Sequence, residues 1–200
     1  MKYSLLALLA CIAAFTGSAL SADIFPVADM TTIPSGSATE TAFMEVCYRP
    51  AHGHPDTRAN ILFDLSPHMG WTAESAILNI NVFYKSDCGL PTSFNTFAAT
   101  EQWDETWTGA HVSHGTINWG MFTIDELQWY QIDVTDLVNS WLSQSTDNYG
   151  LVFESINSNQ AEHRFYSIDA VDPGVRPYLA LTFPQSLETI TWAGVKNSLM

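Results

Sequence analysis

The sequence has few basic residues. It holds 7 lysines and arginines against 21 aspartates and glutamates, which gives a formal net charge of −14. Nucleic acids and anionic membrane surfaces attract proteins through basic patches, so neither is an expected partner. If a leader containing Lys2 is removed, the net charge goes from −14 to −15.

Long apolar runs are also scarce. The clearest runs from Leu5 to Phe15, after Lys2 and before small residues that continue to Ala22. This is the layout of a secretory signal peptide, and the run is too short to cross a bilayer. Residues 1–22 are therefore predicted to be a signal peptide, and no membrane insertion is expected after its removal. The possible cleavage sites follow Ala19, Ser21 or Ala22.

A lipoprotein signal ending at Cys11 is a weaker alternative, because the chain stays apolar after that residue. The chain has only 3 cysteines, and Cys11 would leave with the leader. Cys47 and Cys88 then remain in an oxidising compartment, where one disulfide between them is plausible. The alternative is that both are small buried hydrophobic residues. The predicted location is secreted, extracellular or at the cell surface.

Helical periodicity is nearly absent, whereas short segments rich in β-branched and aromatic residues recur between turn formers. This pattern predicts an all-β domain over residues 23–183, a jelly-roll-like β-sandwich of two antiparallel sheets. The expected strands are Asp23–Ala28, Thr41–Tyr48, Ile61–Leu65, Ser75–Tyr84, Ser93–Thr100, Tyr130–Val134, Tyr149–Ser155, His163–Ile168 and Tyr178–Phe183.

The segment "ILNINVFY" shows the strand alternation most clearly. One of its faces carries Ile77, Asn79, Asn81 and Phe83. The other carries Leu78, Ile80, Val82 and Tyr84, and we expect this second face to be buried.

One short helix is predicted, from Thr135 to Ser143. Thr135 or Asp133 can cap its first turn, and Asp136 favours a helix N-terminus. Its apolar stripe consists of Leu137, Val138, Trp141 and Leu142. Two turns are not stable alone, so the helix must dock on the sandwich.

The stretch from Ala99 to Gly120 is predicted to be a long loop, and it contains three tryptophans. The C–H face of a sugar ring packs on an indole, while neighbouring acids and amides accept hydrogen bonds from its hydroxyl groups. The candidate ligand-binding residues are Gln102, Trp103, Asp104, Glu105, Trp107 and Trp119. The same tryptophans would serve equally well as plugs in the core.

Four segments occur in order between Arg58 and Phe183: "RANILFDLSPHMGWTAESAILNINVFY", "ATEQWDETWTG", "WYQIDVTDLVNSWLSQSTDNYGLVFES" and "HRFYSIDAVDPGVRPYLALTF". Together they resemble the DNRLRE-type domain of secreted and surface proteins. The resemblance implies a jelly-roll sandwich with a short helix that plugs one end through Trp141. It also implies carbohydrate binding, in some relatives to uronic-acid polymers. The scarcity of cations argues against that ligand class here.

The predicted function is therefore a non-catalytic exported module that binds a polysaccharide or a cell-surface glycan. The alternative is a structural or adhesive subunit of a surface assembly with no saccharide ligand. Residues 184–200 form a separate tail, whose "TWAGVKNSLM" resembles a short C-terminal tail of some exported bacterial proteins. The tail is either a sorting or attachment segment or a plain amphipathic extension.

Metal sites are weakly indicated, and no cofactor is expected. His52 with His54, and His111 with His114, have chelating spacings, although solvated loop histidines are the simpler interpretation. A structural calcium ion could be held by some of Asp64, Asp133, Asp136, Asp147, Asp169 and Asp172, but no stretch has the acid density of a calcium loop.

Catalysis is not expected. A glycosidase needs two carboxyl groups across a sugar, for which Glu105, Glu154 and Asp169 are the available candidates. The sequence shows neither a serine-hydrolase signature nor a nucleophilic cysteine motif.

Overall fold

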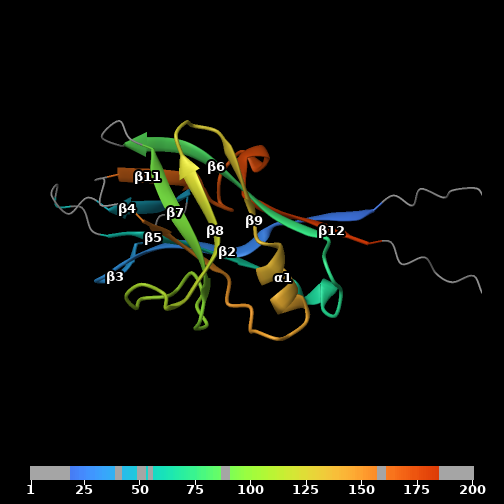
Figure 1. The fold of residues 1–200 in the computed structure, drawn as a ribbon. Helices are drawn as coiled ribbons and strands as arrows, with labels where there is room; N and C mark the ends of the chain where they lie inside the picture. Colours follow the sequence, from blue (N-terminus) through green and yellow to red (C-terminus); the bar gives the residue numbers. More distant parts are fainter. Residues whose placement is uncertain are drawn as a thin grey trace, which may run out of the picture.

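The chain folds as a sandwich of two six-stranded antiparallel sheets with one short α-helix (Figure 1). The computed structural model describes residues 19–38, 42–48, 53, 56–86, 91–156 and 161–184. The predicted all-β, jelly-roll-like class is confirmed.

The first sheet runs in the order β1 (Leu20–Ile24), β12 (Tyr178–Phe183), β6 (Ser75–Ser86), β11 (Ala161–Tyr166) and β4 (Phe43–Tyr48), and β9 (Trp129–Asp133) also pairs with β6. The second sheet runs in the order β3 (Gly36–Ala38), β2 (Pro26–Ile33), β5 (Arg58–Phe63), β10 (Leu151–Ser155), β7 (Thr92–Ala99) and β8 (His114–Ile124).

The main core lies between the sheets and is built from alternate residues of the strands. On β6 the side chains of Leu78, Ile80 and Val82 are buried, as the alternation predicts. Tyr84 was expected on the same face but is 38% exposed. The register between β6 and β11 shifts next to Phe165, and this bulge turns the following residues of β6 the other way.

The helix α1 spans Thr135–Leu142 and confirms the predicted element. Its apolar stripe faces the core, and Trp141 is only 1% exposed. The Asp133 carboxylate accepts hydrogen bonds from the Thr135 amide and hydroxyl, at 2.9 and 2.6 Å, and so holds the start of the helix. The side-chain amide of Asn139 bonds both backbone groups of Ala73, which ties the helix to the segment that leads into β6.

The prediction of one loop from Ala99 to Gly120 was wrong in its second half, because β8 begins at His114. Its alternation is broken where the register with β7 shifts, and Trp119 there has no residue opposite it. Gly120 lets β8 lie against β9 of the other sheet, since a Cβ atom at this position would lie 2.6 Å from Ile132 Cγ2. The two sheets therefore approach each other closely at this edge.

Several expectations fall on residues outside the described ranges, namely Cys88, His52, His54 and the tail from residue 185. The predicted disulfide therefore stays a prediction, and Cys47 is buried. The strand β1 begins at Leu20, within the stretch expected as leader. In the part of the chain that the structure describes, no helix has the length and apolar character needed to cross a membrane.

Candidate functional site

The loop of residues 100–113 folds over the outer face of the second sheet and buries Trp103 there. Trp103 is 5% exposed and packs in a second apolar cluster with Met30, Phe97 and Val152. Its Nε1 donates a hydrogen bond to the Tyr149 carbonyl oxygen at 2.7 Å. The indole thus fastens the loop to the sheet and leaves no open face for a ligand.

Trp107 is half-buried against the same cluster. Its Nε1 donates to the Ala110 carbonyl oxygen at 2.8 Å, and Gly109 lies so close that a Cβ atom there would come within 2.7 Å of the ring. Trp107 lines an open hollow together with Gln102 and Asp104. The Asp104 carboxylate accepts bonds from the hydroxyl and amide of Thr106, which lower its pKa.

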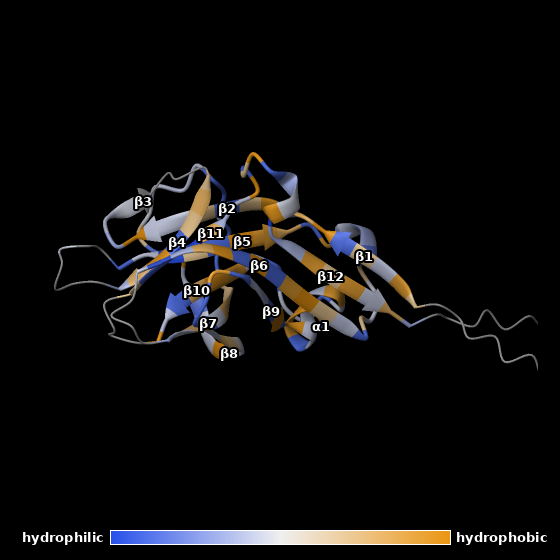
Figure 2. Cartoon of the chain, turned by 90° about the horizontal axis from the view of Figure 1, so that it is seen from above, coloured by the Kyte–Doolittle hydropathy of each residue, from blue (hydrophilic) through white to orange (hydrophobic). Residues whose placement is uncertain are grey.

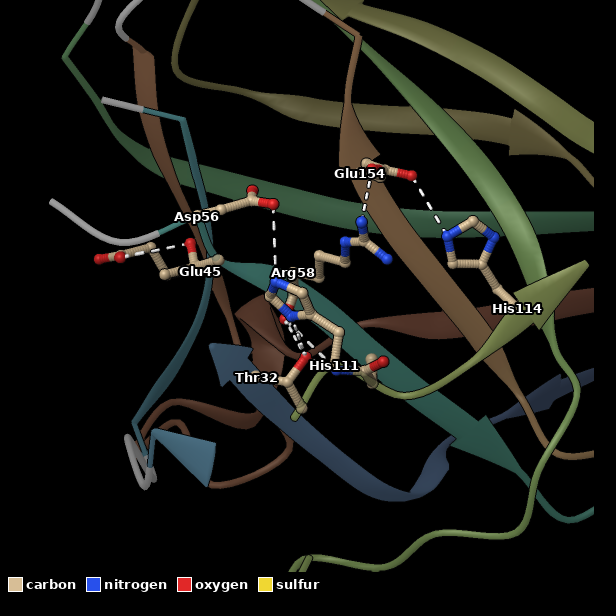
Figure 3. Close-up of polar contacts among 9 residues, drawn as sticks. Thr32, Glu45, Asp56, Arg58, His111, His114 and Glu154 are labelled. Carbon is tan, nitrogen blue, oxygen red and sulfur yellow. Dashed lines mark hydrogen bonds and ion pairs between the residues drawn. The ribbon is translucent and has the colours of Figure 1, made fainter. Parts of the chain in front are cut away.

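Two histidines of the covering segment are held by acids of the second sheet and its borders (Figure 3). The Glu154 carboxylate lies 3.2 Å from His114 Nε2 and 2.7 Å from the Arg58 guanidinium. His111 contacts the Asp56 carboxylate at 3.5 Å through Nε2 and the Thr32 hydroxyl at 3.2 Å through Nδ1. The "HVSH" histidines therefore hold the end of the loop and the start of β8 against polar groups at β2, β10 and the segment before β5.

Asp29 lies on β2 beneath this loop. Its backbone amide donates to the Glu105 carboxylate at 3.3 Å, and its own carboxylate accepts from the Ile168 amide at 2.6 Å. Burial, together with the negative charges of Glu105 and Asp169, raises the pKa of Asp29 to about 7, although the Ile168 bond opposes the shift. The Glu105 carboxylate therefore faces β2 and helps to hold the loop of residues 100–113, the cover of the second sheet, in place.

Trp119 differs from the other two tryptophans. It is half-buried on β8 and rests on the main core at the edge where the two sheets meet. Among the residues that the structure describes, none accepts a hydrogen bond from its Nε1. Its side chain lines two hollows, with volumes of about 480 and 330 Å³.

Carboxylates line both hollows beside Trp119. Asp133 and Asp136 lie in the larger one, next to Asn118 of β8. The Thr135 bonds lower the pKa of Asp133, so this carboxylate stays ionised. Asp147 and Tyr149 line the smaller hollow, where the Tyr149 hydroxyl donates to Asp147 at 3.3 Å.

The floor of the smaller hollow includes Trp141, whose buried Nε1 has no acceptor within the described structure. Because this nitrogen is buried, it is not offered to a ligand in the hollow. The hollow thus combines a carboxylate, a phenol and the Trp119 indole.

The six predicted ligand residues do not form one site. Gln102, Trp103, Asp104 and Trp107 share one hollow, the Glu105 carboxylate faces Asp29, and Trp119 lies with the helix. Residues that sequence reasoning did not assign to the ligand site are Asp133, Asp136, Asp147 and Tyr149. The three aspartates were considered only as helix-capping residues or calcium ligands, since their meeting with Trp119 depends on β8, which was not predicted.

The described residues contain no group of three or more histidine, cysteine, aspartate or glutamate side chains that could hold a metal ion. Asp64 and Asp172 instead accept backbone bonds within turns, from Ser66 and Gly174 at 2.9 and 2.8 Å. A structural calcium ion stays a prediction. Of the carboxylates considered for catalysis, Glu154 is bound to Arg58 and Glu105 to the Asp29 amide.

The domain described above also matches a known protein family in its sequence. Residues 22–183 match the sequence profile of Carbohydrate-binding module family 96, over most of the chain. The chain belongs to this family. Family 96 is a class of carbohydrate-binding modules, whose role is generally non-catalytic. The narrower DNRLRE-type resemblance stays a prediction, and no curated protein matches the chain.

Proposed function

We propose that this family 96 module is exported and binds a polysaccharide or cell-surface glycan at Trp119, without catalysing a reaction. The observation that carries the proposal is the half-buried Trp119 indole, which lines two open hollows and has no described acceptor for its N–H. A sugar ring can stack on such an indole while its hydroxyl groups bond the neighbouring carboxylates.

The lining of the hollows favours a ligand without negative charge. Asp133, Asp136 and Asp147 lie around the ring, and no lysine or arginine is among the described residues that line either hollow. An acidic polymer would meet like charge at this site and over a chain of net charge −14. Neutral polysaccharides are therefore the favoured ligands.

The test is retention of the purified full chain on a panel of neutral and acidic polysaccharides, with and without calcium. We expect retention on a neutral polymer, and Trp119→Ala should weaken it by at least about tenfold, as for a central aromatic contact. Met121→Ala is the matched control, since Met121 is 65% exposed on the same strand.

Two checks make the result decisive. The melting temperature of Trp119→Ala must stay close to that of the parent, and Asp136→Asn, which changes only an exposed carboxylate, should also weaken retention. If both variants bind as the parent does, the ligand site lies elsewhere. If the protein is retained on no polymer at all, the result supports the alternative, a structural or adhesive subunit.

A further inference from the structure

A row of aromatic rings runs over the first sheet and the junction between β1 and β2, and Figure 2 views the molecule from above. Phe25 is 55% exposed and Trp129 39% exposed, and Tyr178 lies between them. The ring centroids are 6.3 Å apart for Phe25 and Tyr178 and 5.8 Å apart for Trp129 and Tyr178. Exposed aromatic groups of this kind mark interaction surfaces. We call these three residues the aromatic row.

Neutral amides lie beneath and beside the aromatic row. Asn79 is 3% exposed on β6, between β12 and β9. Its Oδ1 accepts a bond from Gln131 Nε2 at 3.0 Å, and its Nδ2 donates to the Ile77 carbonyl oxygen at 3.0 Å. Gln131 is exposed two residues from Trp129. An ordered amide has both donors and acceptors, so it suits sugar hydroxyl groups.

The strand β9 connects the aromatic row to the Trp119 hollow. Its outward positions are Trp129, Gln131 and Asp133, because alternate residues of a strand share a face. Asp133 also lines the larger hollow beside Trp119. From Trp129 to Asp133 this line covers about 13 Å, with an indole close to each of its ends.

The turn that precedes β9 is fixed. The Tyr130 hydroxyl donates to the Asp125 carboxylate at 2.8 Å and accepts bonds from the amides of Asp125 and Glu126 at 3.1 Å. Trp129 is therefore presented on a rigid strand rather than on a free loop, which reduces the entropy lost when a ligand binds.

We propose that the glycan site extends from Trp119 along β9 to the aromatic row, and that it binds the interior of a neutral polysaccharide chain rather than a single terminal sugar. The proposal rests on the Trp119 function. Rings at both ends stack successive sugars, and the Gln131 amide and the Asp133 carboxylate bond the hydroxyl groups between them. Affinity should then rise with chain length and change little with salt, because the ligand carries no charge.

The full chain is first tested for retention on cellulose, xylan, glucomannan and laminarin. Oligosaccharides of increasing length are then prepared from the polymer that retains it, and their binding is measured by isothermal titration calorimetry. The parent should bind long oligosaccharides at least about tenfold more tightly than the disaccharide. Trp129→Ala should remove about tenfold on long chains only, whereas Trp119→Ala should weaken binding at every length. Phe25→Ala, at an even more exposed ring, supplies a second variant, and Met121→Ala is the control.

The outcomes separate the two proposals. If Trp119→Ala weakens binding but affinity is independent of length, or Trp129→Ala leaves long-chain affinity unchanged, the extended site is refuted and the Trp119 site stands. If Trp129→Ala weakens binding and Trp119→Ala does not, both the Trp119 site and the continuous path are wrong. If none of the four neutral polymers is retained, the extended site for a neutral chain is refuted, and the Trp119 site falls as well only if no acidic polymer of the panel is retained.

Discussion

The two outer faces of the sandwich differ in what covers them. The second sheet is covered by the loop of residues 100–113, which buries Trp103 and encloses the ring of Trp107. On the first sheet, no segment among the described residues covers the exposed rings of Phe25 and Trp129 or the half-buried ring of Tyr178 in this way. Tryptophan therefore packs into the fold on one face, as Trp103 and Trp107, and is exposed on the other, as Trp129.

This difference shows how to separate structural from ligand-facing tryptophans. Trp103 and Trp107 each donate their N–H to a backbone carbonyl of the protein, at 2.7 and 2.8 Å. No described residue accepts from Trp119, and the ring borders two hollows. A tryptophan whose donor is used internally belongs to the fold, whereas a partly exposed ring without a described acceptor, such as Trp119, is available to a ligand.

The largest effect on stability is expected from replacing Trp103, which anchors the loop of residues 100–113 to the second sheet. Trp103→Ala deletes a buried indole and leaves the Tyr149 carbonyl oxygen without its donor, so it should lower the free energy of unfolding by about 3–5 kcal/mol. Urea denaturation followed by tryptophan fluorescence measures the change. Trp129→Ala on the open face is the matched substitution and should cost less than about 1 kcal/mol. Equal losses for the two variants would contradict the distinction between the faces.

The next effect concerns the acid beneath the cover. The folded-state pKa of Asp29 is about 7, against 3.8 for the free side chain. Between these values the folded state holds more protons than the unfolded state, so stability falls as pH rises, by up to about 1.4 kcal/mol per pH unit. The destabilisation is complete above about pH 7 and absent below pH 3.8.

Asp29→Asn should therefore stabilise the protein by about 2–4 kcal/mol at pH 8 and by little near pH 4. The asparagine keeps an oxygen for the Ile168 amide but carries no charge next to Glu105 and Asp169. Unfolding free energies from pH 4 to pH 8 test this, with Glu74→Gln at an exposed position as control. A parallel pH profile for Asp29→Asn and its parent would show that the Asp29 carboxylate is not the source of the dependence.

Most of the fold could be predicted from the sequence because its signals are local. The alternation in "ILNINVFY" and the stripe of Leu137, Val138, Trp141 and Leu142 depend only on neighbouring residues, and both elements are present. The strand β8 was missed because the bulge at Trp119 and the glycine at Gly120 break its period. Those two irregularities are also what bring β8 against β9 and the helix.

The candidate site was only partly predictable, for a related reason. A cluster of tryptophans in the sequence indicates aromatic surface, but it does not say which ring meets a sheet and which meets solvent. That depends on pairs distant in sequence, such as Trp103 with Tyr149 and Glu105 with Asp29. The aromatic row likewise joins Phe25, Trp129 and Tyr178, which lie far apart along the chain.

A smaller effect is expected at the charged contacts of Glu154, which join strands β5, β10 and β8 of the second sheet beside the cover. Glu154→Gln keeps the side-chain size but removes the charge that faces Arg58 and His114, and it should cost about 1 kcal/mol. The loss should shrink at high salt, because the pairs are partly exposed. Thermal melts at low and high ionic strength measure it, and Glu74→Gln at an exposed position is the control. A salt-independent loss would point to packing rather than charge.

The smallest effect is expected at the edge of the open-faced sheet. The residues Leu20, Ser21 and Ala22 of β1 pair with the last residues of β12, but the first two are exposed. Cleavage of the predicted leader after Ala19 would keep these pairs, whereas cleavage after Ala22 would remove them at a cost of about 1 kcal/mol. If the leader is removed as predicted, we expect the mature chain to begin at Leu20, which its intact mass will show. Equal unfolding free energies for chains that start at Leu20 and at Asp23 would mean that the pairing adds nothing, and the choice of cleavage site would then rest on the small residues of the leader alone.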